Sequence, residues 1–130
     1  MSSNPTILVV EDEILIRLAL VDIFEGAGFV VLEAGDGPEA IKFIDTHADN
    51  IGILLTDIRL GEGPCGWDVA RHARSQLEDL PIVFVSGDSA DDWSEEGIER
   101  SVMLAKPVPD AELLAAVRNG LQSTVGSSGK

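Results

Sequence analysis

Cysteine is nearly absent from the chain, because Cys65 is the only one among 130 residues. A single thiol cannot form a disulfide within the chain or build a thiolate metal site. Cys65 lies beside Gly66 in a glycine-rich segment, and we interpret it as incidental. Aromatic residues are also few, at 5%. A chain of this length can bury a substantial core, which must therefore consist mainly of Ile, Leu, Val and Ala.

Basic residues are scarce as well. The chain has 9 Lys and Arg residues against 23 Asp and Glu residues, for a formal net charge of −14. Binding to nucleic-acid phosphates requires clustered Lys and Arg, so we expect no nucleic-acid partner. Some of the acids are expected to gather where a cation offsets their repulsion, and the others to form a solubilising surface.

Long hydrophobic runs are missing too. No run approaches the ~18 consecutive apolar residues of a membrane span. Residues 1–5 do not begin a basic segment followed by an apolar one, which a secretory signal would have. We therefore expect a cytoplasmic protein without membrane contact.

Short apolar runs, by contrast, are frequent, and they alternate with segments of helical character. The runs are continuous, as is typical of strands covered on both faces of a parallel sheet, and they lie at residues 7–10, 29–32, 53–55, 82–85 and 102–105. Between the first two, apolar residues recur at helical spacing from Ile16 to Ala27. Asp36 followed by Pro38 predicts the start of the next helix, and Asp110 that of the last.

This alternation of five strands with five helices predicts βαβ units and a parallel sheet. The expected fold class is α/β: a doubly wound, flavodoxin-like five-stranded parallel sheet of order 2-1-3-4-5. We expect the domain over residues 5–122, with flexible termini at 1–4 and 123–130. The fourth helix, expected within residues 89–100, has only Trp93 and Ile98 as large apolar anchors, so it should be short and loosely held.

Polar residues stand at the ends of four of these runs. Glu11 and Asp12 follow the first run, Asp57 follows the third, Ser86 the fourth and Lys106 the fifth. Ligands of such sheets bind at the carboxyl ends of the strands, so we expect these side chains to form one site. Taken singly, the acids after the first run could merely favour a helix N-terminus, and Ser86 could be a turn former.

Carboxylates that converge in this way repel one another, and one would take up a proton unless a cation were bound. Oxygen ligands favour Mg²⁺, with Mn²⁺ as an acceptable substitute. Asp57 would then be a nucleophile toward phosphorus, since carboxylates form aspartyl-phosphates. The metal and Lys106 would neutralise the phosphoryl oxygens, and the Ser86 hydroxyl would hydrogen-bond to one of them.

The motifs around these residues resemble those of the receiver domain of two-component response regulators. The resemblance rests on Val10-Glu11-Asp12, Leu55-Thr56-Asp57, Val85-Ser86-Gly87 and Ala105-Lys106-Pro107. It implies a phosphorelay signalling domain that takes a phosphoryl group from a sensor histidine kinase or a histidine phosphotransfer protein. It implies no enzyme activity beyond the domain's own phosphorylation and dephosphorylation.

The resemblance also assigns a role to each residue of the expected site. These roles are Asp57 as phospho-acceptor, Asp12, Asp57 and the backbone carbonyl of Arg59 as Mg²⁺ ligands, Glu11 as a ligand through a water molecule, Ser86 as the switch hydroxyl and Lys106 as the phosphoryl-binding lysine. A cis peptide bond between Lys106 and Pro107 is implied as well.

One feature departs from the family pattern. Three residues before Lys106 the family usually carries an aromatic residue or His, whereas this chain has Met103, which we interpret mainly as core packing. The resemblance places the output face over residues 89–122, which includes Met103 and Trp93. How phosphorylation reaches a downstream protein target through Met103 is left open.

Two other functions remain open on the residues alone. A Mg²⁺-dependent phosphatase with an aspartyl nucleophile usually needs a second acid two residues after the nucleophile, where this chain has Arg59. The other is a vestigial receiver that only binds partners, which the complete residue set disfavours. No output domain follows residue 122, so we expect either a stand-alone regulator or a receiver taken from a longer protein.

Overall fold

The computed structural model describes residues 4–87 and 98–128, with side chains up to Gln122. Its elements in chain order are β1 (Thr6–Val10), α1 (Ile14–Gly26), β2 (Val30–Ala34), α2 (Gly37–His47), a short 3-10 helix η1 (Ala48–Asn50), β3 (Ile53–Asp57), α3 (Gly66–Gln76), β4 (Ile82–Ser86), β5 (Ser101–Ala105) and α5 (Asp110–Ser128). Within these residues, no helix is both long enough and apolar enough to cross a membrane.

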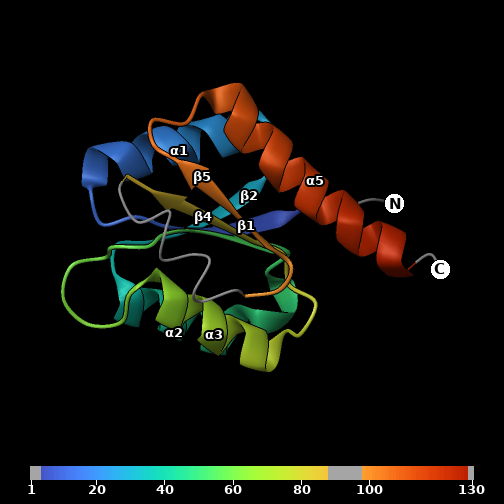
Figure 1. Ribbon diagram of the computed structural model, residues 1–130, viewed down its shortest axis with the longest axis horizontal. Coiled ribbons are helices and arrows are strands. Elements are labelled where there is room, and N and C mark those ends of the chain that lie inside the picture. Colours follow the sequence, from blue (N-terminus) through green and yellow to red (C-terminus); the bar gives the residue numbers. More distant parts are fainter. Residues whose placement is uncertain (1–3, 88–97, 129–130) are drawn as a thin grey trace.

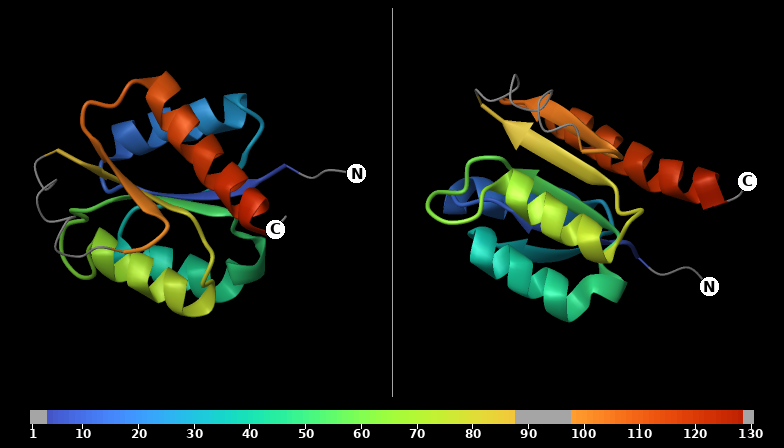
Figure 2. Two further views of the ribbon diagram at one scale, coloured as in Figure 1. Left: turned by 45° about the vertical axis from the view of Figure 1, so that its right-hand side comes forward. Right: turned by 60° about the horizontal axis from the view of Figure 1, so that its bottom comes forward.

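The strands form a single parallel sheet in the order β2-β1-β3-β4-β5. This confirms the predicted sheet type and strand order. Helices α1 and α5 cover one face of the sheet, and α2 and α3 cover the other (Figures 1 and 2). The sheet is therefore the middle of three layers, with apolar cores on both sides.

Alternate residues of each central strand serve these two cores. In β1, Ile7 and Val9 belong to the core under α1 and α5, whereas Leu8 and Val10 belong to the core under α2 and α3. All four side chains are at most 1% exposed. A strand that is buried on both faces must be apolar at every position, which accounts for the continuous apolar runs of the sequence.

The strand register brings the carboxyl ends of the central strands to one edge. Val10 of β1 pairs with Thr56 of β3, one residue before Asp57. At the other side of the sheet, Ser86 of β4 pairs with Ala105 of β5. The residues at the ends of these four strands therefore lie along the same edge.

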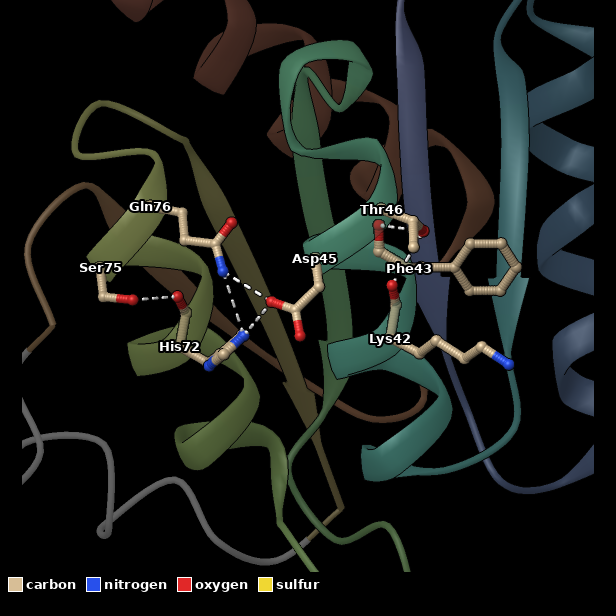
Figure 3. Close-up of polar contacts among 7 residues, drawn as sticks. All are labelled: Lys42, Phe43, Asp45, Thr46, His72, Ser75 and Gln76. Carbon is tan, nitrogen blue, oxygen red and sulfur yellow. Dashed lines mark hydrogen bonds and ion pairs between the residues drawn. The ribbon is translucent and has the colours of Figure 1, made fainter.

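A polar cluster joins the two helices on the lower face in Figure 1. His72 Nε2 and Gln76 Nε2 of α3 lie 2.7 Å and 2.6 Å from Asp45 Oδ1 of α2 (Figure 3). The hydrogen bond with His72, followed by that from Gln76, lowers the pKa of Asp45 below its ordinary value. These contacts link α2 and α3 on their exposed side, above the core that both helices cover.

The helices differ from expectation at two places. Most of the segment expected as the fourth helix, residues 88–97, lies outside the described residues, and the described part of the chain contains four α-helices. Helix α5 continues to Ser128, beyond residue 122, where we expected the domain to end; flexibility of the terminus stays a prediction. No proline follows Pro109, so each added residue can extend the helix with a further hydrogen bond.

Gly66, the first residue of α3, lies directly against the end of β3. A Cβ atom at this position would be 2.3 Å from the carbonyl oxygen of Asp57 and 2.8 Å from the Cα of Ile58. The amide of Gly66 donates to the carbonyl oxygen of Ile58 at 2.7 Å. Because these neighbours are backbone atoms, a side chain at position 66 would force α3 and the end of β3 apart.

We expect Gly66→Ala to lower the free energy of unfolding by about 1–3 kcal/mol, because the methyl group overpacks this contact. Gly26→Ala is the matched control, since a methyl group at the end of α1 meets nothing within 4 Å and should leave stability unchanged or raise it by up to ~1 kcal/mol. Urea denaturation followed by circular dichroism measures both. Equal stabilities of the two variants would contradict the close approach at Gly66.

Candidate functional site

The structure brings the predicted strand-end residues together at the carboxyl edge of the sheet. Glu11, Asp57 and Ser86 are only 2%, 8% and 3% exposed. Asp12 is exposed and Lys106 is half-buried. Buried charged groups require compensation by partners of opposite charge or by hydrogen bonds, so the contacts of Glu11 and Asp57 determine what this edge can do.

Lys106 provides the compensating positive charge. Its Nζ donates to Asp57 Oδ2 at 2.8 Å and lies 3.6 Å from Glu11 Oε1. The ammonium group therefore contacts both buried carboxylates, which come from two neighbouring strands. The peptide bond that follows, between Lys106 and Pro107, is cis, as the family resemblance implies.

A third carboxylate, that of Asp12, lies close to the two that contact Lys106. Glu11, Asp12 and Asp57 each present an oxygen, and these oxygens all lie within 4.8 Å of one another. Carboxylate oxygens without thiolate or imidazole donors are the ligand set of hard cations such as Mg²⁺. The donor set and its excess negative charge therefore fit a divalent magnesium ion.

Backbone amides orient the two buried carboxylates. The amide of Glu13 donates to Glu11 Oε2 at 3.1 Å, and the amide of Arg59 donates to Asp57 Oδ1 at 3.3 Å. Both oxygens of Asp57 are thus engaged, one by Arg59 and one by Lys106. The turn after β3 folds back over Asp57, so the backbone of Arg59 lies at the site; a ligand role for its carbonyl stays a prediction.

The environment of Glu11 favours its protonated form. Burial raises the pKa of Glu11 to about 7 from an ordinary value of 4.5, and the charge of Asp57 adds to this effect against the amide of Glu13. Burial alone would lower the pKa of Lys106, but the hydrogen bond and charge of Asp57 outweigh it and the pKa is raised. At neutral pH, Lys106 is therefore charged and Glu11 is close to its titration midpoint.

A cavity of about 430 Å³ opens beside these groups. Glu11, Asp57 and Lys106 form its polar side, and its other walls are apolar, with residues from β1, β3, β4, α1 and α5. Apolar walls lower the local dielectric constant, which strengthens the interaction between the lysine and the carboxylates.

Of the two residues predicted for the output face, the structure describes Met103. Trp93 lies outside the described residues. Met103 is half-buried, pairs with Phe84 across β4 and β5, and packs against the core under α2 and α3 that includes Trp67. This contact confirms that Met103 is core packing, and its role in output stays a prediction.

Arg17 belongs to this edge of the sheet although no pattern in the sequence predicted it. Its Nη1 donates to the backbone carbonyl oxygen of Glu11 at 3.0 Å. Side chains of a helix point back toward its N-terminus, so a basic residue in the first turn after an acidic strand end is the signal that could have identified it.

Known proteins are similar to this chain in sequence. The family described as "Response regulator receiver domain" matches residues 7–118. The Aerobic respiration control protein ArcA of Escherichia coli (strain K12) is 33% identical over 124 residues, which cover 94% of this chain and 50% of that protein. Sensor kinase CckA of Brucella abortus (strain 2308) is 28% identical over 131 residues, which cover 94% of this chain and 13% of that protein. The chain thus spans half or less of the length of these relatives.

A solved structure extends the similarity to the whole fold. The crystal structure of a response regulator receiver protein from Sinorhizobium medicae WSM419 matches with a TM-score of 0.89 and 36% sequence identity, covering 93% of this chain and 97% of that one. Receiver domains bind Mg²⁺ at an acidic pocket, and this chain gathers the carboxylates of Glu11, Asp12 and Asp57 at the sheet edge. The chain belongs to the response regulator receiver family, whose members are phosphoryl-acceptor signalling domains.

Proposed function

We propose that this domain takes a phosphoryl group onto Asp57 from a sensor histidine kinase or a histidine phosphotransfer protein, and that it thereby switches or competes for protein partners. The observation that supports this most is the contact of 2.8 Å between Asp57 Oδ2 and Lys106 Nζ, next to the carboxylates of Glu11 and Asp12. A carboxylate beside a lysine and a cation site is equipped to attack phosphorus.

In the proposed step, a carboxylate oxygen of Asp57 attacks the phosphorus atom opposite the leaving group. An O–P bond forms while the P–N bond to the donor imidazole breaks, and the departing imidazole takes up a proton. Lys106 would then contact the phosphoryl oxygens, and the Ser86 hydroxyl would donate to one of them. Phosphoryl transfer depends mainly on such positioning and charge stabilisation.

The acidic cluster would hold the metal ion. Asp12, Asp57 and the carbonyl of Arg59 would be direct ligands, with Glu11 acting through a water molecule. When bound, Mg²⁺ supplies positive charge to the transferring phosphoryl oxygens, and Mn²⁺ is an acceptable substitute. Asp57 would thus both bind the cation and carry out the attack.

Ser86 and Lys106 would transmit phosphorylation to the rest of the domain. The amide of Lys106 donates to the carbonyl oxygen of Ser86 at 2.9 Å, so the ends of β4 and β5 are directly coupled. The phosphoryl group would favour the conformation in which Ser86 closes over the site. We place the output face over residues 89–122, with a fourth helix, Trp93 and Met103 as parts of it.

The same proposal covers the setting of the domain. We place the protein in the cytoplasm, where kinases of this type present their phosphohistidine. The domain itself would span residues 5–122. The net charge of −14 disfavours nucleic acid as a direct target. Its chemistry would be limited to its own phosphorylation and dephosphorylation, since Arg59 stands where an aspartyl phosphatase would carry its second acid.

Intact-mass measurement after incubation with acetyl phosphate tests the acceptor. We expect one phosphoryl adduct on the wild-type protein in the presence of Mg²⁺, none without Mg²⁺, and none on Asp57→Asn, because the amide is no nucleophile. Wild-type protein that neither gains an adduct nor binds beryllofluoride with Mg²⁺ would show a vestigial site and contradict phosphoryl transfer to Asp57; binding without an adduct would show that the site needs its own kinase as donor. Rapid turnover of a generic phosphomonoester would instead favour the phosphatase function.

Mg²⁺ binding is expected to depend on pH through Glu11. The pKa of Glu11 is raised in the folded state, to about 7. Protonated Glu11 therefore stabilises the metal-free fold at low pH. This contribution to the free energy of unfolding is lost as the pH rises through about 7. Below that pH a proton must leave before Mg²⁺ binds, so affinity should fall about tenfold between pH ~8 and pH ~6. Isothermal titration calorimetry measures the Mg²⁺ affinity at each pH. In the control variant Glu11→Gln, the affinity should change much less with pH. Equal wild-type affinities at both values would refute this role of Glu11.

A further inference from the structure

Arg17 connects the acidic site to the neighbouring strand. It lies in the first turn of α1, and its side chain is 18% exposed. Its Nε donates to Glu33 Oε1 of β2 at 3.0 Å, and its Nη1 donates to the backbone carbonyl oxygen of Glu11 at 3.0 Å. One guanidinium group thus joins α1, β2 and the turn that carries two of the three clustered carboxylates.

This contact completes the anchoring of Glu11. The amide of Glu11 donates to the carbonyl oxygen of Ala34 at 3.1 Å, and its side chain accepts from the amide of Glu13 at 3.1 Å. The carbonyl held by Arg17 belongs to the peptide unit that joins Glu11 to Asp12. Because a peptide unit is planar, fixing that oxygen also fixes the direction in which the chain enters Asp12.

Asp12 depends on this backbone more than its neighbours do. Its side chain is exposed, and among the described residues no hydrogen bond holds its carboxylate. Glu11 and Asp57, by contrast, are each oriented by a backbone amide and by Lys106. The position of the Asp12 oxygen within the cluster therefore follows from the peptide plane that Arg17 holds.

The fold leaves a path for the guanidinium group at the end of β2. A Cβ atom on Gly35 would lie 2.9 Å from Arg17 Nη1. The Arg17 side chain therefore packs against a position that has no side chain of its own. The charge of Arg17 is offset by its ion pair with Glu33, which leaves little net field at the acidic cluster. The contribution of Arg17 to the site is therefore geometric.

We propose that Arg17 is a positioning residue of the metal site: it holds the peptide plane between Glu11 and Asp12 so that the Asp12 carboxylate faces those of Glu11 and Asp57. This role rests on the proposed function, because it takes the carboxylate cluster to be the Mg²⁺ site. Arg17 uses two of its three guanidinium nitrogens, Nε toward Glu33 and Nη1 toward Glu11, so a lysine would not replace it.

The test is Mg²⁺ affinity, measured by isothermal titration calorimetry on the full chain without any phosphodonor. We expect Arg17→Ala to bind Mg²⁺ about tenfold more weakly, at the lower end of what partners of metal ligands contribute, and Arg17→Lys to fail to restore it. Gly35→Ala should weaken binding in the same direction, because its methyl group displaces the Arg17 side chain while the charge stays. At saturating Mg²⁺, the rate with acetyl phosphate should recover in all three.

Two control variants separate positioning from charge and from stability. Glu33→Gln removes the ion pair but leaves the bond from Arg17 to Glu11, so Mg²⁺ affinity should stay within about twofold of wild type. Ile51→Ala, at the opposite end of β3, should lower the melting temperature and leave Mg²⁺ affinity unchanged.

The outcomes distinguish this role from the function on which it rests. Wild-type protein that does not bind Mg²⁺ overturns the proposed metal site itself. Wild-type binding with an unchanged affinity in Arg17→Ala overturns only the role of Arg17. Equal weakening in Glu33→Gln and Arg17→Ala would show that the site depends on the ion pair between Arg17 and Glu33 rather than on the bond from Arg17 to the Glu11 carbonyl, and would also overturn it.

Discussion

The repulsion among the carboxylates of Glu11, Asp12 and Asp57 is the constraint on which the rest of the site depends. Their oxygens lie within 4.8 Å of one another, and Lys106 supplies one positive charge beside these three acids. Burial, with the charge of Asp57 adding to it, raises the pKa of Glu11 to about 7. A divalent cation offsets the remaining charge, and an arriving phosphoryl group then meets positive charge from both the metal and the lysine. Binding of the cation and reactivity toward phosphorus thus follow from one arrangement of charges.

The sheet holds these like charges together because the positions of its buried strands are fixed by the two cores. Parallel strands buried on both faces end in register, so the residues after β1 and β3 emerge side by side. The turns are then fixed by contacts that involve no apolar burial: Arg17 holds the turn after β1, and the approach of Gly66 sets the turn after β3. The hydrophobic core therefore positions the acids roughly, and backbone hydrogen bonds set the direction of each carboxylate.

The features that were predictable from the sequence are those with a local signature. Continuous apolar runs predicted strands buried on both faces, and the polar residues at their ends predicted that Asp57 and Lys106 lie at one edge of the sheet. Contacts between distant segments have no such signature. The bond from Arg17 to Glu11 and the approach of Gly66 to Asp57 depend on how α1 and α3 pack onto the sheet. The extension of α5 to Ser128 was missed because a helix end without proline or a strong cap leaves only a weak local signal.

The most direct test of this account is the thermal stability of Asp12→Asn with and without Mg²⁺, beside the wild-type protein. If repulsion dominates the site, removing one like charge from an exposed position should raise the melting temperature of the metal-free protein by a few degrees. The same substitution should abolish the further rise that Mg²⁺ gives the wild-type protein. A variant that is less stable than wild type without Mg²⁺, yet keeps the full stabilisation by Mg²⁺, would contradict the account.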